Sequence, residues 1–195
     1  MKKPLTVAAW SAFWGIVLAL ISMLTGLGEG GSFILGLNIV ITIVGAVLGF
    51  LFLYGFVVLG KKFDVALLVV MAWIGIAITV GFSILVLILN ASIIASAQEA
   101  AISASQDISE GVSALILFLV LWVPISLFFG AYSILFGVGL LKLKDKVEYA
   151  KTAAILDIVG GATLVIFIGA AISLVSYFFK IAVMFKAARK YEGKR

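Results

Sequence analysis

The sequence contains no cysteine and no histidine, and only two prolines among its 195 residues. Without cysteine the chain has no disulfides, thiolate metal sites or cysteine nucleophiles. Without histidine it lacks the commonest metal ligand and the commonest general base. Charged residues are also scarce, at 12% of the chain, while hydrophobic residues reach 65%. A soluble globular chain is about half apolar and about a quarter charged, so this composition indicates a protein surrounded mostly by lipid.

The few basic residues are distributed unevenly between the hydrophobic runs. All fourteen lysines and arginines lie within residues 2–3, 61–62, 142–151 and 180–195, and the two other gaps between hydrophobic runs contain acids and no base. Basic residues in alternate gaps, and therefore on one side of the membrane, are typical of a multi-pass membrane protein oriented by the positive-inside rule. We therefore expect a multi-pass membrane protein with the basic gaps and both termini in the cytoplasm.

The hydrophobic runs predict the spans, each of which needs about 20 apolar residues. The last apolar stretch, 152–187, is ambiguous, because its 36 residues would make a single helix about 54 Å long. We interpret it as two short spans that meet near residues 168–171. The alternative is a five-span protein with 176–190 as an amphipathic helix on a membrane surface. The preferred prediction is a single all-α polytopic transmembrane helix bundle, 1–195, with six spans at about 5–25, 33–59, 65–95, 108–141, 152–168 and 171–187.

Asp157 lies within the fifth predicted span, where a carboxylate is costly and tends to mark an ion or proton path or a buried partner. In the predicted hairpin Asp157 lies 13 residues before Ala170, and Lys180 lies 10 residues after it. Their depths in the bilayer would then differ by only about 5 Å. We predict an intramembrane charge pair between Asp157 and Lys180, with an ion or proton path through Asp157 as the alternative.

Three further features concern the helices themselves. Gly45 and Gly49 form a small-xxx-small motif, which lets another helix approach closely. We interpret it as a helix-packing motif within the bundle, with homodimerisation as the alternative. Pro124 lies inside the fourth span, where it removes a backbone hydrogen bond and predicts a kink. Asp64 directly precedes the third span and is a candidate N-cap.

The end of the chain resembles a known group of proteins. Residues 149–162 read YAKTAAILDIVGGA and residues 178–185 read FFKIAVMF. These segments are similar to the closing hairpin of a family of small archaeal multi-pass membrane proteins, in which a stretch of the type K-x-A-x-I-L-x-I-I-G-A leads to a short hairpin and an aromatic, basic end. Asp157 stands where that pattern has an apolar residue. The resemblance implies an archaeal cell membrane and carries no established activity.

The sequence shows no catalytic set, because its serines and threonines have no histidine to activate them and its one deep acid is isolated. We expect no enzymatic activity, no cofactor, no metal site and no nucleic-acid partner. The expected partners are the lipid bilayer and either other membrane subunits or further copies of the chain. The first functional hypothesis is a non-catalytic accessory subunit or assembly partner. The alternative is a transporter or channel for a small solute or ion, acting as an oligomer.

Overall fold

The computed structural model describes residues 4–26, 32–100, 108–166 and 168–192. These residues form helices and turns without a strand, which confirms the predicted all-α bundle. The elements are α1 (Pro4–Gly26), α2 (Ser32–Lys62), α3 (Ala66–Ala100), α4 (Ile108–Leu141), α5 (Ala150–Ala162), the 3-10 turn η1 (Leu164–Ile166) and α6 (Ile168–Glu192).

Five of these helices are long and apolar enough to cross a membrane, namely α1, α2, α3, α4 and α6. The protein is therefore a multi-pass integral membrane protein. Helix α5 differs, because it has only 13 residues. At about 1.5 Å per residue it covers about 20 Å, which is less than the roughly 30 Å of hydrocarbon in a bilayer.

The last apolar stretch folds as a helical hairpin made of α5, η1 and α6. Helix α5 ends at Ala162, and Gly169 N donates a hydrogen bond to Thr163 O at 3.0 Å, which closes the turn. The sequence predicted this turn near residues 168–171, and in the structure it lies slightly earlier, after Ala162. Helix α6 is continuous and packs against α5 and α1. It does not form the separate surface helix at 176–190 of the five-span alternative.

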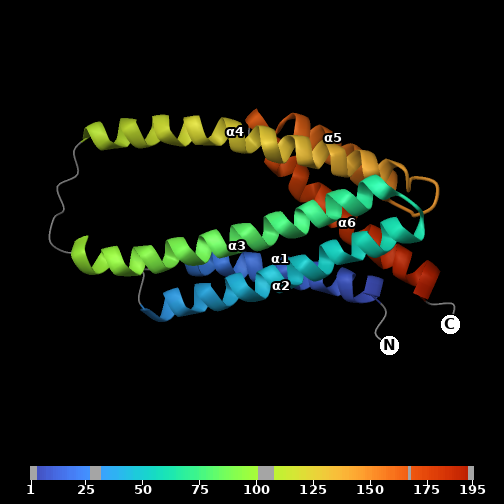
Figure 1. Ribbon diagram of the computed structural model, residues 1–195, viewed down its shortest axis with the longest axis horizontal. Coiled ribbons are helices and arrows are strands. Elements are labelled where there is room, and N and C mark those ends of the chain that lie inside the picture. Colours follow the sequence, from blue (N-terminus) through green and yellow to red (C-terminus); the bar gives the residue numbers. More distant parts are fainter. Residues whose placement is uncertain (1–3, 27–31, 101–107, 167, 193–195) are drawn as a thin grey trace.

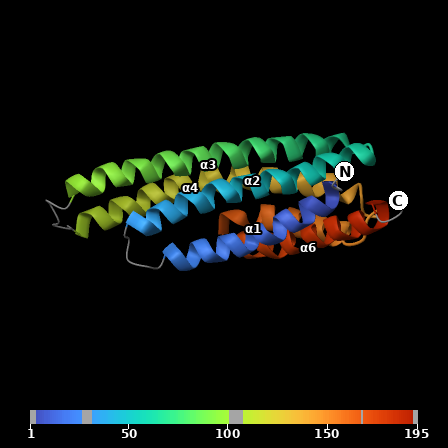
Figure 2. The same cartoon turned by 90° about the horizontal axis from the view of Figure 1, so that it is seen from below.

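The six helices form a ring in which each packs against the next and α6 returns to α1. Figure 1 shows both ends of the chain at the same end of the bundle, together with the α2–α3 and α4–α5 connections. Figure 2 shows α1 and α6 on one side and α2, α3 and α4 on the other. The carboxylate of Glu192 accepts hydrogen bonds from Leu5 N at 2.8 Å and Thr6 N at 3.1 Å. This contact ties the end of α6 to the start of α1.

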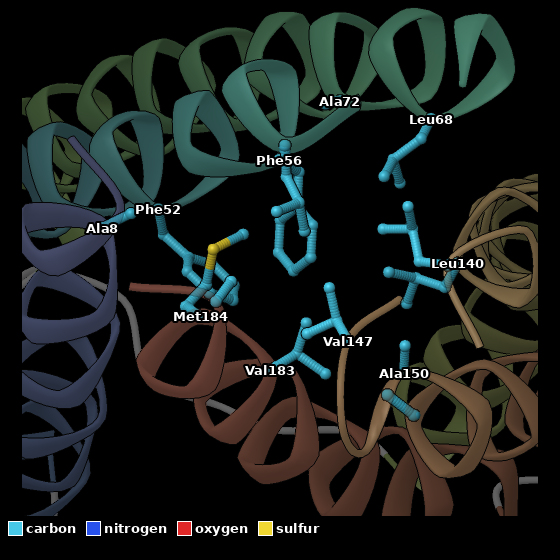
Figure 3. Packing of buried hydrophobic residues seen from close by; sticks show 14 of the residues in the cluster. Ala8, Phe52, Phe56, Leu68, Ala72, Leu140, Val147, Ala150, Val183 and Met184 are labelled. Atoms are coloured by element: carbon cyan, nitrogen blue, oxygen red, sulfur yellow. The ribbon is translucent and has the colours of Figure 1, made fainter. Parts of the chain in front are cut away.

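The apolar core occupies the half of the bundle next to the chain ends. Phe56 of α2 is fully buried there, and its ring centroid lies 5.1 Å from that of Phe136 of α4. Figure 3 shows Phe56 pointing into the space between the helices, toward Val147 and Val183. Leu143 and Val147, from the connection before α5, are also buried, so this connection closes the core.

Asp64 ends α2 and does not cap α3. Its φ of 56° is left-handed. Val65 N donates to Gly60 O at 2.8 Å and Asp64 N to Lys61 O at 3.4 Å, the two bonds of a Schellman motif. The N-cap prediction was therefore wrong. The sequence signal was ambiguous because aspartate is common at N-caps and also tolerates the left-handed region better than most residues.

Candidate functional site

Asp157 lies on α5 at the centre of the candidate site and is fully buried. The face of α5 around it consists of small residues, among them Ala153, Ala154, Gly160 and Gly161. Small side chains let α4 and α6 approach the backbone of α5 closely, as in other membrane helices. A Cβ built on Gly161 would lie only 2.6 Å from a backbone oxygen of α4. The close packing explains why this carboxylate lies away from solvent and lipid.

The partners of Asp157 come from α6. Lys180 Nζ lies 2.8 Å from Asp157 Oδ1, and Ser176 Oγ donates to the same oxygen at 2.6 Å. The side chain of Asp157 is 1% exposed and that of Lys180 is 17% exposed. The second carboxylate oxygen, Oδ2, is buried and has no hydrogen-bond partner among the described residues. The ion pair is therefore asymmetric, with one oxygen holding both donors.

Helical spacing explains why Ser176 takes part. Ser176 and Lys180 are four residues apart, so both side chains lie on the same face of α6. Ser176 was not predicted from the sequence, although its spacing of four residues from Lys180 is a signal that could have identified it. Helix α4 adds a third polar contact, because Ser133 Oγ donates to the backbone oxygen of Asp157 at 3.0 Å. Three helices thus converge on this residue.

Two adjoining cavities, both partly open to the outside of the bundle, lie between the helices, and the smaller one borders Lys180. The larger has a volume of about 710 Å³, and the smaller has about 330 Å³. We call them together the chamber, because Ile78, Thr79, Phe129 and Tyr132 line both. Lys180 lines the smaller cavity and thus forms the charged base of the chamber. The other residues around the larger cavity are Thr42, Gly45, Ala46, Phe82, Ser83, Trp122, Ile125, Ser126, Ser133, Leu164 and Ser173.

The hydroxyl groups around the larger cavity add little hydrogen-bonding capacity to it. The hydroxyls of Thr42, Thr79, Ser83 and Ser126 each donate to a carbonyl three or four residues earlier in their own helix, at 2.8–2.9 Å. A hydroxyl bonded in this way has no hydrogen left to donate to a ligand. The larger cavity is therefore mainly apolar, and the charge in the described lining of the chamber is that of Lys180 in the smaller cavity.

The remaining predicted residues fall into different settings. A Cβ built on Gly49 would lie 3.1 Å from the side chain of Thr79, so Gly49 faces α3 inside the bundle. Gly45 lines the larger cavity and has no neighbour within 4 Å of such a Cβ. Pro124 is an exposed residue inside α4, which continues through it as one helix. Trp122, two residues earlier, donates to the backbone oxygen of Val165 at 3.4 Å, linking α4 to the hairpin turn.

The described part of the chain holds no group of three acids that could bind a metal ion. Comparison of the chain with protein-family models, with curated proteins and with solved structures gives no match. The chamber and the ion pair at its base are the features of the described residues that point to a function.

Proposed function

We propose that this integral membrane protein binds a lipid-like amphiphile in the chamber, as a membrane-embedded binding protein or transporter. The observation that carries the proposal is a large apolar cavity between α2, α3, α4 and α6 that adjoins a smaller one, whose described lining contains the charged residue Lys180. Ligand sites in proteins typically have volumes of about 300–1,000 Å³, apolar walls and a few polar groups that orient the ligand. The volume of about 710 Å³ for the larger cavity lies in this range.

The depth of the charged base supports a ligand that comes from the bilayer. Lys180 is ten residues from Lys190, or about 15 Å along α6. The basic residues at the chain ends mark the headgroup region, and Lys186, which is exposed, is six residues or about 9 Å from Lys180 along α6. The base of the chamber therefore lies within the hydrocarbon, on the side of the chain ends. The basic connections favour a cytoplasmic position for this end. The resemblance to archaeal membrane proteins favours the cell membrane as the location.

The proposal favours the transporter class over the accessory-subunit hypothesis, because an assembly partner needs no ligand-sized cavity beside a buried ion pair. The two are distinguished by purification from native membranes. A lone protein, as a monomer or an oligomer, agrees with the present proposal, while a stable complex with other subunits supports the accessory role. Either outcome is compatible with the absence of enzymatic activity and of a cofactor, which we retain as predictions.

Tryptophan fluorescence can test binding directly, because Trp122 lines the larger cavity. Trp10, Trp14 and Trp73 are replaced by phenylalanine, and the purified protein in detergent is titrated with a fatty alcohol that carries bromine on its chain. We expect saturable quenching of Trp122. A second protein that keeps only Trp73, which is 47% exposed, reports simple partitioning of the probe into the micelle.

A matched pair of variants locates the bound probe. Ala46 lines the larger cavity, whereas its neighbour Val47 is exposed on the outside of α2. Ala46→Phe should abolish saturable quenching because the new ring occupies the cavity. Val47→Phe should leave it unchanged. If the quenching of Trp122 never saturates and matches that of Trp73, the probe only partitions into the detergent micelle. The proposed function would then be wrong.

A further inference from the structure

The base of the chamber is electrically neutral as it stands, and this limits what it can bind. Lys180 carries one positive charge and Asp157 one negative charge, with Nζ and Oδ1 2.8 Å apart. Bringing an anion to Lys180 while Asp157 stays ionised would place two negative charges beside one positive charge in a poorly hydrated site. An unpaired charge in such a place is strongly destabilising. An anionic ligand therefore fits only if Asp157 gains a proton.

Asp157 has an atom at which that proton can be held. Its Oδ1 already accepts from Lys180 and Ser176, while the buried Oδ2 has no partner among the described residues. A buried, ionised oxygen without a donor is costly. A proton on Oδ2 removes this cost and also weakens the hold of Asp157 on Lys180, because the attraction between full charges is lost.

We infer that the amphiphile is a single-chain carboxylic acid, whose carboxylate replaces Asp157 as the partner of Lys180. This inference rests on the proposed function and names its substrate class. In the exchange, the acid enters uncharged, its carboxyl group loses one proton, and Asp157 takes up one proton on the buried Oδ2. The Lys180–Asp157 ion pair breaks, a Lys180–ligand ion pair forms, and Lys180 keeps its three protons. The site has a net charge of zero before and after the step.

A carboxylic acid fits this exchange better than other anions for two reasons. It carries the same ionisable group as Asp157, so the proton moves between chemically similar oxygens. It also brings one negative charge, whereas a phosphate monoester brings between one and two near neutral pH. The alkyl chain would extend from Lys180 past Thr79 and Phe129 into the larger cavity, since these residues line both parts of the chamber.

The other groups around the base do not supply a competing charge. Tyr132 of α4, which lies within electrostatic reach of Asp157, and Tyr177 of α6 line the smaller cavity together with Lys180. From α2 and α3 the described lining of the smaller cavity contains apolar residues, glycines and Thr79. Among the described residues that line this cavity, Lys180 is therefore the one cation.

The test compares dodecanoic acid with dodecanol on the protein that keeps Trp122, by competition with the brominated fatty alcohol. Where the acid is ionised in solution, its affinity for the wild type should fall tenfold for each pH unit, because one proton is taken up with each anion. Dodecanol should bind equally at each pH. In Asp157→Asn the site carries a net positive charge, so the acid should bind as an anion and its affinity should no longer depend on pH.

Infrared spectroscopy with dodecanoic acid labelled with ¹³C at the carboxyl gives a second readout that needs no variant. We expect the bound ligand to show carboxylate bands and the protein to gain a protonated-acid band from Asp157. The double variant Asp157→Asn, Lys180→Met serves if the single variant does not fold. It should bind the acid only in its protonated form and show no carboxylate band.

The outcomes separate the inference from the proposed function. Suppose that dodecanol competes with the brominated probe, so that the proposed function stands. The inference about the carboxylic acid is then wrong if the wild type binds the acid in its protonated form. It is also wrong if the affinity of Asp157→Asn for the acid keeps the wild-type pH dependence. If neither compound competes and the brominated probe itself does not saturate, the proposed function fails as well. Carboxylate bands in the wild type that disappear in the double variant support the inference.

Discussion

The ion pair at the base of the chamber also predicts how the hairpin depends on its two charges. Replacing Lys180 by methionine leaves Ser176 as the one side-chain donor to the carboxylate of Asp157 among the described residues. The side chain of Asp157 is 1% exposed. Removing one partner of a buried ion pair typically costs about 3–5 kcal/mol. We expect Lys180→Met to lie within this range and to loosen the contact between α5 and α6.

The opposite replacement should cost less. Asparagine at position 157 can still accept a hydrogen bond from Ser176 and Lys180 through its side-chain oxygen. Lys180 is 17% exposed and faces the smaller cavity, so its charge is better hydrated than that of Asp157. We expect Asp157→Asn to cost about 1.5–3 kcal/mol, the range for hydrogen bonds to charged groups. The order of the two costs follows from the difference in burial.

The double variant Asp157→Asn, Lys180→Met removes both charges and should recover much of the loss. Unfolding of the four proteins in one detergent by chemical denaturant measures the coupling between the two positions. The contact of Lys186 with Glu148 serves as the control, because its N–O distance of 2.7 Å is similar but its side chains are 39% and 56% exposed. The hydrogen bond from Lys186 holds the pKa of Glu148 below its ordinary value of 4.5. The control pair is therefore ionised at neutral pH.

Solvent screens an exposed ion pair, so Lys186→Met and Glu148→Gln should show no measurable coupling. The reasoning about Asp157 and Lys180 would be refuted by losses that simply add in the double variant. It would also be refuted if Asp157→Asn cost more than Lys180→Met, since burial would then not determine the cost.

Two further predictions concern the contact between the end of α6 and the start of α1, and the close packing of α5 against α4. Glu192→Ala removes the acceptor of the Leu5 and Thr6 amides at the start of α1. It should lower the free energy of unfolding by about 0.5–2 kcal/mol, as the loss of other N-caps does. Hydrogen exchange should become faster at these two amides. Gly161→Ala places a methyl group 2.6 Å from a backbone oxygen of α4 and should cost about 1–3 kcal/mol of unfolding free energy. Gly81→Ala, where such a methyl group has no neighbour within 4 Å, is the control and should not destabilise the protein.

The sequence predicts the helices well because the bilayer imposes a simple rule on their length and polarity. Hydrophobic runs and the positions of the lysines predicted six spans with basic connections at one end. The structure has a helix at each predicted span, and α5, with 13 residues, is the one that is too short to cross the hydrocarbon. The spacing of Asp157 and Lys180 about a hairpin turn is also sufficient to suggest their proximity. Both arguments use only distance along the chain, which helical geometry converts directly into depth.

The chamber could not be predicted in the same way. Its walls combine Ala46 of α2, Thr79 of α3 and Phe129 of α4, which lie far apart in the sequence, and nothing in a uniformly apolar run indicates which face lines a cavity. The turn after α2 was misinterpreted for a local reason, because Asp64 suits both an N-cap and a left-handed C-terminal position. The hydrogen bonds of Val65 and Asp64 decide between them.

The ion pair can stabilise the hairpin and also take part in ligand binding, because it lies between the apolar core and the chamber. The pair holds α5 against α6 only while Lys180 has an anionic partner. A ligand carboxylate that takes the place of Asp157 keeps Lys180 neutralised, so the hairpin loses no charge compensation during binding. A neutral ligand leaves the original pair intact. The base of the chamber therefore admits a carboxylic acid with its proton, while an anion without a proton must leave one buried charge unpaired.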